Sequence, residues 1–229
     1  MNQTARETWS SVMEKNVKVT LPLGPNTVDR YINDPKRLGF MMARYKCAAK
    51  LMSRCESILD VGCGDGFGTL TFLHETHAPK IMGVDFDGDL IGYATSILTP
   101  AVHKVSPVNA SRLRWQAMDV FDLYQMFNGI CCLDMIEHLK PEDNSRFIEH
   151  LASMLLPGGI CIIGTPNAHA EQYASAHSKA GHTNLLTHDK LRSELEGRFS
   201  AVFMFSLSDE VLHLGFEKLG HYVFAVAVK

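Results

Sequence analysis

Residues 57–69 combine a short apolar run with a dense group of glycines. Residues 58–61 are typical of a buried strand, and residues 70–73 begin a segment with helical periodicity. Between them lie Gly62, Gly64, Gly66 and Gly68. Glycines let a ligand approach the backbone closely, and a helix start offers unpaired N–H groups and a positive dipole end. The stretch therefore predicts a cofactor site.

The glycine spacing argues against a dinucleotide. A nicotinamide or flavin site needs the pattern G-x-G-x-x-G. Counted from Gly62, the third glycine would fall on Phe67, and counted from Gly64 it would fall on Thr69. Neither register fits.

A second group of reactive side chains follows another apolar run, residues 129–134. Asp134, Glu137 and His138 are spaced i, i+3 and i+4, so on a helical turn they would share one face. His182 and His188 come later, after the next expected strand. Two carboxylates with one or two imidazoles suit a divalent cation with open positions, such as Mg²⁺, Mn²⁺ or Fe²⁺. Two other interpretations stay open, namely His138 as a metal-free general base and a structural Glu137–His138 pair.

The letters LDVGCGDGFGT, residues 59–69, resemble the first motif of class I S-adenosylmethionine (SAM) dependent methyltransferases. The resemblance implies that Asp60, Gly62, Gly64 and Gly66 surround the methionine part of SAM. The alternative is an ordinary glycine turn of an α/β protein.

Acids at the ends of the next strands agree with this resemblance. Asp85 ends the second expected strand, nineteen residues after Gly66, where such folds place a carboxylate on the ribose hydroxyls. Phe86 beside it could pack on the adenine. Asp119 matches the family position that binds the adenine amino group, and three apolar residues complete the expected SAM site: Met118, Val120 and Leu133. The alternatives are a surface acid at 85 and a helix cap at 119.

Residues 34–40 resemble a segment that precedes the first motif in ubiquinone-type O-methyltransferases. The resemblance implies that Arg37 reaches the carboxylate of SAM, a bidentate contact that suits a guanidinium. A solvated helix arginine is the alternative.

The pattern D-x-x-E-H also resembles two methyltransferase groups. One is the ubiquinone O-methyltransferases, and the other is the small-RNA 3′-terminal 2′-O-methyltransferases, where a matching set holds a metal. The resemblance implies four metal ligands: Asp134, Glu137, His138 and His182. Asp134 departs from the usual Glu, and a cation here would lower the pKa of an acceptor hydroxyl.

Five β-α repeats followed by two strands without a crossover helix predict the fold. We expect a Rossmann-like, seven-stranded, mostly parallel sheet with helices on both faces and an antiparallel last strand. Residues 99–111, with two prolines, are expected to form a loop. The whole chain, 1–229, is expected to be one domain, with residues 1–35 as a lid or tail and residues 166–190 as a substrate loop.

Composition narrows the partners. The chain has 229 residues, 46% of them hydrophobic, and a formal net charge of −3. No apolar run reaches the roughly 18 residues of a membrane span, and the first residues lack a signal-peptide layout, so a cytoplasmic location is expected. Lys and Arg form no long run, so nucleic acid is not an expected partner. A homodimer is one possible assembly.

These features predict a SAM-dependent O-methyltransferase acting on a hydroxyl of a small molecule or glycan. One alternative is RNA 2′-O-methylation, which a salt-dependent RNA affinity would support. The other is a SAM-binding protein without catalysis, which would need no converging acids and histidines.

Overall fold

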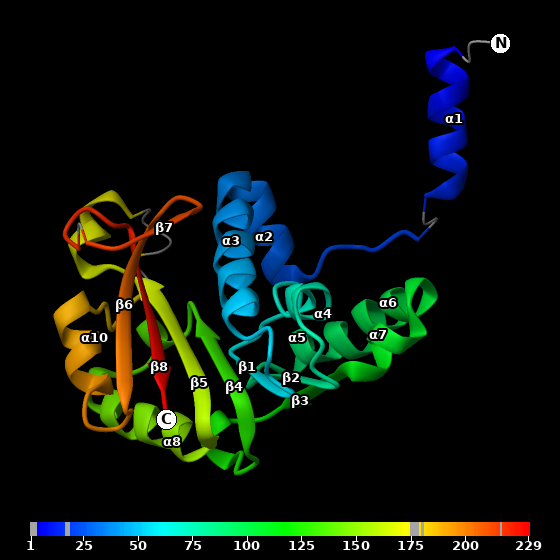
Figure 1. Ribbon diagram of the computed structural model, residues 1–229. Helices are drawn as coiled ribbons and strands as arrows, with labels where there is room; N and C mark the ends of the chain where they lie inside the picture. Colours follow the sequence, from blue (N-terminus) through cyan, green and yellow to red (C-terminus); the bar gives the residue numbers. More distant parts are fainter. Residues whose placement is uncertain (1–3, 17–18, 175–178, 180, 216) are drawn as a thin grey trace.

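A mixed sheet forms the centre of the protein (Figure 1). The computed structural model describes residues 4–16, 19–174, 179, 181–215 and 217–229. Within them the strands are β1 (Ser57–Val61), β2 (Lys80–Asp85), β3 (Leu113–Ala117), β4 (Phe127–Leu133), β5 (Leu155–Pro166), β6 (Ala201–Ser208), β7 (Val211–His213) and β8 (Tyr222–Val228).

The strand order is β3-β2-β1-β4-β5-β8-β6-β7. The first five are parallel, whereas β8 runs antiparallel to both β5 and β6. This confirms the Rossmann-like, mostly parallel sheet. It differs from the expected seven strands by β7, a three-residue strand that pairs with β6 at the sheet edge.

Helices cover both faces of the sheet. Those described are α1 (Ala5–Lys15), α2 (Pro25–Asn33), α3 (Pro35–Leu51), α4 (Leu70–Glu75), α5 (Gly88–Tyr93), α6 (Thr99–Val105), α7 (Pro107–Arg112), α8 (Asn144–Ser153) and α10 (His188–Leu195). In Figure 1, α1 lies apart from the sheet, and none of its residues is buried.

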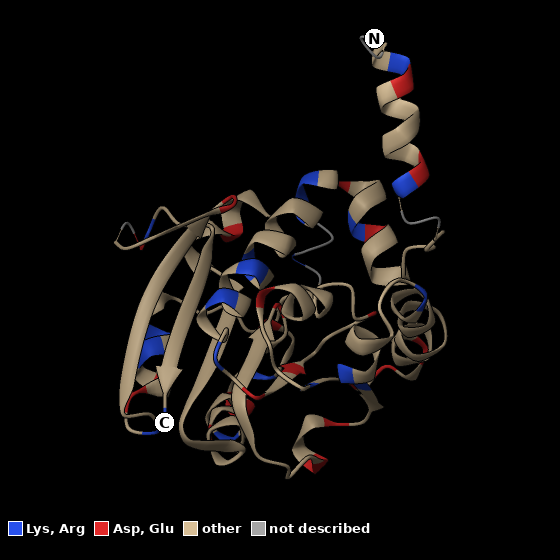
Figure 2. Cartoon of the chain, turned by 45° about the vertical axis from the view of Figure 1, so that its right-hand side comes forward, with Lys and Arg blue, Asp and Glu red and all other residues tan. Residues whose placement is uncertain are grey.

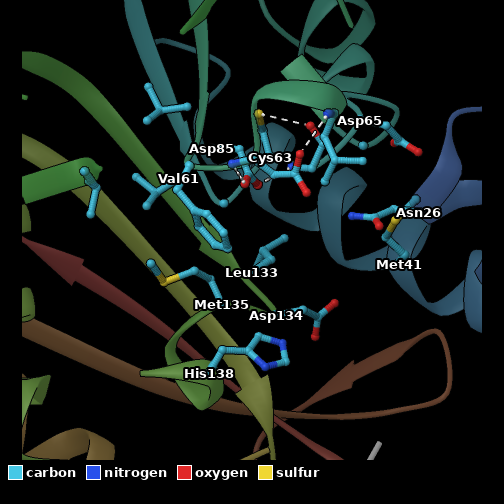
Figure 3. Close-up of a pocket in the computed structure, with 18 of the residues that line it drawn as sticks. Asn26, Met41, Val61, Cys63, Asp65, Asp85, Leu133, Asp134, Met135 and His138 are labelled. Atoms are coloured by element: carbon cyan, nitrogen blue, oxygen red, sulfur yellow. Dashed lines mark hydrogen bonds between the residues drawn. The ribbon is translucent and has the colours of Figure 1, made fainter. Parts of the chain in front are cut away.

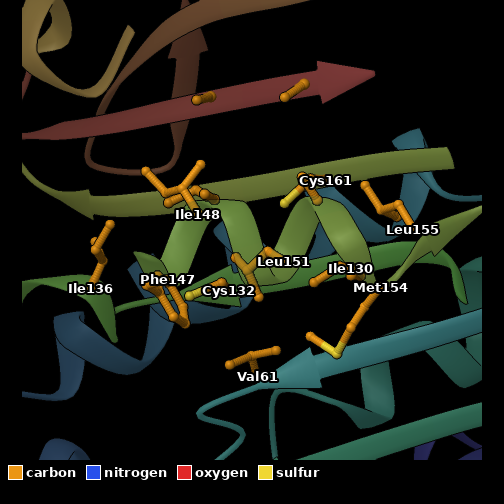
Figure 4. Packing of buried hydrophobic residues seen from close by; sticks show 14 of the residues in the cluster. Val61, Ile130, Cys132, Ile136, Phe147, Ile148, Leu151, Met154, Leu155 and Cys161 are labelled. Carbon is orange, nitrogen blue, oxygen red and sulfur yellow. The ribbon is translucent and has the colours of Figure 1, made fainter. Parts of the chain in front are cut away.

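Alternate residues of the central strands pack into two hydrophobic cores, one on each face of the sheet. Leu59 and Val61 of β1 belong to the cluster on the side of α8 and α10, whereas Ile58 belongs to the cluster beneath α3 and α4. Figure 4 shows the first cluster, where Phe147 and Leu151 of α8 lie against the sheet. Because successive strand residues point to opposite faces, both faces are closed to water.

Helix α3 begins and faces the core for local reasons. Asp34 is its N-cap and accepts a hydrogen bond from the Lys36 backbone N–H at 3.3 Å, and Pro35 occupies the first turn. Its buried residues, Met41, Tyr45, Ala48 and Ala49, recur at helical spacing. The other face of its first half is left for the site described below.

Residues 99–111 are not a loop. They form most of α6 and α7, and each of the two prolines lies in the first turn of a helix. Proline has no N–H to lose there, and its fixed φ suits a helix start. In the described part of the chain, no helix has the length and apolar character needed to cross a membrane.

Candidate active site

The glycine loop after β1 adopts backbone conformations that strongly favour glycine. Gly62, Gly64 and Gly66 have φ values of 71°, 57° and 79°, in the region that other residues rarely adopt. A Cβ on Gly62 would lie 2.8 Å from the Cγ of Met135. The loop is held toward β2, because the Gly62 and Cys63 N–H groups donate to the Val84 carbonyl at 2.9 and 3.2 Å.

A cavity of about 530 Å³ lies along this loop and beyond the carboxyl ends of β1, β2 and β4 (Figure 3). We call it the donor cavity. Eight of the eleven residues expected at the SAM site line it: Gly62, Gly64, Asp85, Phe86, Met118, Asp119, Val120 and Leu133. Parallel α/β sheets place ligands at such a point, where the strand order reverses.

Backbone amides hold the carboxylates of the donor cavity. Asp85 accepts hydrogen bonds from the Gly64 N–H at 2.9 Å and the Asp87 N–H at 3.0 Å, one on each oxygen. A carboxylate has about four acceptor positions, so two remain for ligand hydroxyls. Asp119 likewise accepts from the Phe121 N–H at 3.0 Å. Phe86 is 84% exposed and leaves a free aromatic face at the rim.

Asp60 and Gly66 support the loop without lining the cavity. The Asp60 carboxyl is fully buried and accepts from the Thr69 hydroxyl at 2.5 Å and the Tyr45 hydroxyl at 3.3 Å. Burial raises the pKa of Asp60 to about 7. A Cβ on Gly66 would lie 2.5 Å from the ring of Trp115. Both residues therefore stabilise the turn from the side that faces away from the cavity.

Helix α2 is fastened over the donor cavity by a contact that the sequence did not suggest. The buried Asp65 carboxylate accepts from the Thr27 N–H at 2.8 Å and the Thr27 hydroxyl at 2.9 Å. In Figure 3, Asn26 of α2 and Met41 of α3 approach the cavity. The second half of the expected lid thus lies against the glycine loop.

A second cavity of about 650 Å³ adjoins the first, and we call it the acceptor cavity after the role proposed for it below. It lies between α2, α3, the 3₁₀ turns η3 (Ile136–His138) and η5 (Ala168–Tyr173), and residues 181–185. Arg37 lines this cavity and not the donor cavity. Five residues line both: Asn26, Arg30, Met41, Asp134 and His138. The two cavities therefore meet at these side chains.

Glu137, His138 and His182 gather at the inner end of the acceptor cavity. One potential ligand atom of each lies within 4.8 Å of the others. The Nδ1 of His138 lies 2.7 Å from the Gly181 carbonyl oxygen, which can only accept, so Nδ1 carries the proton and Nε2 is left as an acceptor. Glu137 is 1% exposed and accepts from the Thr165 hydroxyl at 3.0 Å.

Burial shifts the proton affinities of this group. Burial and the neighbouring Asp134 charge raise the pKa of Glu137 to about 8, so this carboxyl is largely protonated at neutral pH. Burial and the nearby His138 lower the pKa of His182, which keeps that imidazole neutral. Two imidazoles and a carboxyl are a donor set that can bind a divalent cation.

Asp134 lies outside this group because the chain turns at it. Its φ is 55°, in the left-handed region, and only residues 136–138 form a 3₁₀ turn, so the expected shared helical face does not form. The Arg44 Nη1 donates to both Asp134 oxygens, at 2.9 and 3.0 Å. Burial opposes this charge, but Arg44 holds the pKa of Asp134 below its usual value. The guanidinium also stacks on the Tyr222 ring at 3.6 Å.

Of the four expected metal ligands, three are brought together and Asp134 is paired elsewhere. His188 is also elsewhere, because its Nε2 contacts the Phe205 carbonyl and the Ser206 hydroxyl. Part of the expected substrate loop, residues 175–178 and 180, lies outside the described residues. Sequence reasoning missed Arg30, Arg44, Thr27 and Thr165, which no local motif marks.

Comparison with known proteins agrees with this geometry. A model of the methyltransferase domain family matches residues 27–198. A ubiquinone biosynthesis O-methyltransferase of Psychrobacter arcticus is 26% identical over 150 residues, which is 64% of this chain and 54% of that protein. One of Coxiella burnetii is 30% identical over 119 residues, 51% of this chain and 46% of that protein. The chain thus spans about half the length of these relatives.

Solved structures share the fold at low identity. The methyltransferase domain of bacterial CtHen1-C superposes with a TM-score of 0.67 at 15% identity, covering 82% of this chain and 97% of that one. Magnesium protoporphyrin IX methyltransferase from Synechocystis PCC 6803, solved with bound S-adenosylhomocysteine (SAH), gives 0.63 at 18% identity, covering 100% and 95%.

The fold is that of class I SAM-dependent methyltransferases. Within that class, the chain belongs to the methyltransferase domain family.

Proposed function

We propose that the protein transfers the methyl group of SAM to a hydroxyl of a small molecule or glycan. The observation that carries this proposal is the junction of the two cavities, where Asp134 and His138 line both. A donor and an acceptor bound in adjoining cavities would meet there, which is the alignment that a direct displacement needs.

In this proposal the donor cavity binds SAM through side chains already held in place. Asp85 accepts the two ribose hydroxyls on its remaining lone pairs, and Asp119 accepts from the adenine amino group. Phe86 stacks on the adenine. Arg30 binds the SAM carboxylate, because it lines the donor cavity and no carboxylate of the described residues forms an ion pair with it.

His138 is the proposed base. Its Nδ1–H donates to the Gly181 carbonyl, which leaves Nε2 to accept the proton of the acceptor hydroxyl. As the oxygen bonds to the methyl carbon, the sulfur–carbon bond breaks, and the sulfonium becomes a neutral thioether. The proton leaves on Nε2.

A divalent cation fits the same residues. Glu137, His138 and His182 offer one carboxylate oxygen and two nitrogens, and Mg²⁺, Mn²⁺ or Fe²⁺ are the candidates. Such a cation would lower the pKa of a bound hydroxyl. The buried Glu137 carboxyl, with its raised pKa, would gain a counter-charge for its ionised form.

SAH release from a panel of hydroxyl acceptors, assayed with and without exhaustive chelation, tests this proposal. Turnover that stops on chelation and returns with added cation supports the metal-assisted form. Full activity after chelation supports His138 alone. Absence of SAM binding by calorimetry would sink the proposal in both forms.

RNA 2′-O-methylation is a second candidate, favoured by the Glu137–His138–His182 group. The net charge of −3 speaks against it, because phosphate binding usually shows as clustered Lys and Arg. A steep loss of RNA affinity with salt would favour it. A SAM-binding protein without catalysis is less well supported, since it would not need these three side chains around one point.

A further inference from the structure

Cationic side chains line one wall of the acceptor cavity. They all come from α2 and α3: Arg30, Lys36, Arg37 and Arg44. Figure 2 shows basic positions at the start of α3. Among the described residues, only Arg44 has a carboxylate partner, Asp134. Because Arg30 also lines the donor cavity and is proposed above for the SAM carboxylate, Lys36 and Arg37 are the cations left without an ion pair beside the acceptor cavity.

The acids around the same cavity do not meet this need. Asp209 lies 3.9 Å from His221, and Asp29 accepts a hydrogen bond from the Asn33 amide at 2.7 Å. Glu171 lines the cavity but forms no ion pair with Lys36 or Arg37. Among the described residues, neither Lys36 nor Arg37 has a carboxylate within ion-pair distance.

Arg37, His138 and His182 line the same cavity. The rest of the lining is partly apolar, through Phe40, Pro166, Ala170, Tyr173 and Leu185.

We propose that the methyl acceptor carries a carboxylate or phosphate, bound by Arg37 and Lys36 while its hydroxyl faces His138. The inference rests on the proposed methyl transfer and adds the chemical class of the acceptor. A guanidinium binds such anions with two parallel hydrogen bonds, and a lysine adds a point charge. The apolar lining fits an aromatic or aliphatic body between the anion and the hydroxyl, and about 650 Å³ is room for one small molecule.

Three matched probes test the anion requirement. Catechol, 3,4-dihydroxybenzoate and phenyl phosphate are titrated into the SAH-saturated protein, and binding is followed by ligand-observed NMR. The carboxylated probe should bind about 10-fold to 100-fold more tightly than catechol. Phenyl phosphate, which has no free hydroxyl, tests whether an anion alone is enough for binding.

Variants of the wall locate the effect. Arg37→Gln should remove most of the difference between benzoate and catechol, Lys36→Gln should reduce it, and Arg37→Lys should keep part of it. Arg54→Gln, an exposed arginine beyond the end of α3, removes the same charge and should change nothing. SAH affinity of each variant shows that the fold and donor cavity are intact.

Equal binding of catechol and 3,4-dihydroxybenzoate, binding of neither, or an unchanged preference in Arg37→Gln would overturn the inference. An RNA oligonucleotide that binds more tightly than all three probes through Arg37 would overturn it too. These results leave methyl transfer untouched if SAM still binds. A loss of SAM affinity in Arg37→Gln would instead return Arg37 to the donor carboxylate.

Discussion

The donor and acceptor cavities hold their polar groups by different means. In the donor cavity, Asp85 and Asp119 are fixed by backbone N–H groups, two of them from residues only two positions further along the chain. In the acceptor cavity, long-range side-chain contacts hold the groups. Arg44 and Asp134 are 90 positions apart, His138 and Gly181 are 43 apart, and Thr165 and Glu137 are 28 apart.

Because of this difference, a distant substitution should affect the carboxylates of the two cavities differently. A carboxylate held by its own turn keeps its place when a distant side chain changes. A carboxylate held by a side chain from another element depends on tertiary packing. The donor cavity therefore suits a ligand that does not change. In the acceptor cavity, a single substitution can alter which ligand is bound.

The largest expected effect is a loss of turnover without a matching loss of SAM binding. His138→Ala should lower kcat by about 10²-fold to 10⁴-fold, because the base or metal ligand is lost. SAM affinity should change much less than kcat, since His138 lies at the junction of the two cavities and does not contact Asp85 or Asp119. Calorimetry with SAM and an SAH-release assay measure the two quantities separately.

The exposed His74 of α4 provides a matched control, and His74→Ala should leave both quantities unchanged. His182→Ala then separates the two mechanisms. A loss as large as that of His138→Ala indicates a cation held by both imidazoles. A small loss indicates that His138 acts alone.

The partly buried ion pair of the acceptor side should carry the next largest effect. Arg44→Met leaves the Asp134 carboxylate without its partner and should cost about 1–3 kcal/mol in the free energy of unfolding. The double variant Arg44→Met/Asp134→Asn should recover much of this loss, because no unpaired charge remains. Asn tolerates the left-handed conformation at position 134.

Urea unfolding of the single and double variants measures this effect. A change below about 1 kcal/mol in Arg44→Met would mean that the pair behaves as a surface ion pair, and the contrast between the cavities would weaken.

The same contrast explains what could be predicted from the sequence. Gly62, Asp85 and Asp119 belong to a strand-turn pattern that repeats along the chain, so the strand ends and the family resemblance together placed them at one edge of the sheet. The parallel order and the antiparallel β8 followed from the same pattern. The short β7 did not, because three residues carry no periodicity.

The acceptor side was harder to predict because its geometry is not local. Asp134 was expected beside Glu137, but a turn with positive φ and the distant Arg44 draw it away. Arg37 was expected at the SAM carboxylate, and the structure places it on the wall of the other cavity. Neither result is encoded in spacing within one element, and both depend on how α2 and α3 lie over the sheet.

A smaller effect is expected on the donor side. Asp85→Asn keeps the shape of the side chain and one acceptor oxygen but removes the charge, so SAM affinity should fall about tenfold. Binding of 3,4-dihydroxybenzoate in the other cavity should not change. Asp89→Asn, an exposed acid on α5, is the matched control. An unchanged SAM affinity in Asp85→Asn would contradict the ribose role.

The smallest expected effect compares one buried carboxyl from each side by pH. Burial raises the pKa of Asp60 from 3.8 to about 7, and burial with the Asp134 charge raises that of Glu137 from 4.5 to about 8. Each acid binds its proton more tightly in the folded state. Its contribution to stability is therefore full below the lower value and is lost as pH rises to the higher one.

Between pH 7 and pH 8 Glu137 should titrate in this way more than Asp60, which has lost about half of its proton by pH 7. Glu137 should lower the free energy of unfolding by up to about 1.4 kcal/mol across that unit. Glu137→Gln should flatten this part of the profile most, whereas Asp60→Asn should act mainly at lower pH. Urea unfolding at half-unit steps from pH 5 to pH 9 measures both. If Asp60→Asn flattened the profile between pH 7 and pH 8 and Glu137→Gln left it steep, Asp60 and not Glu137 would be the main group that titrates there.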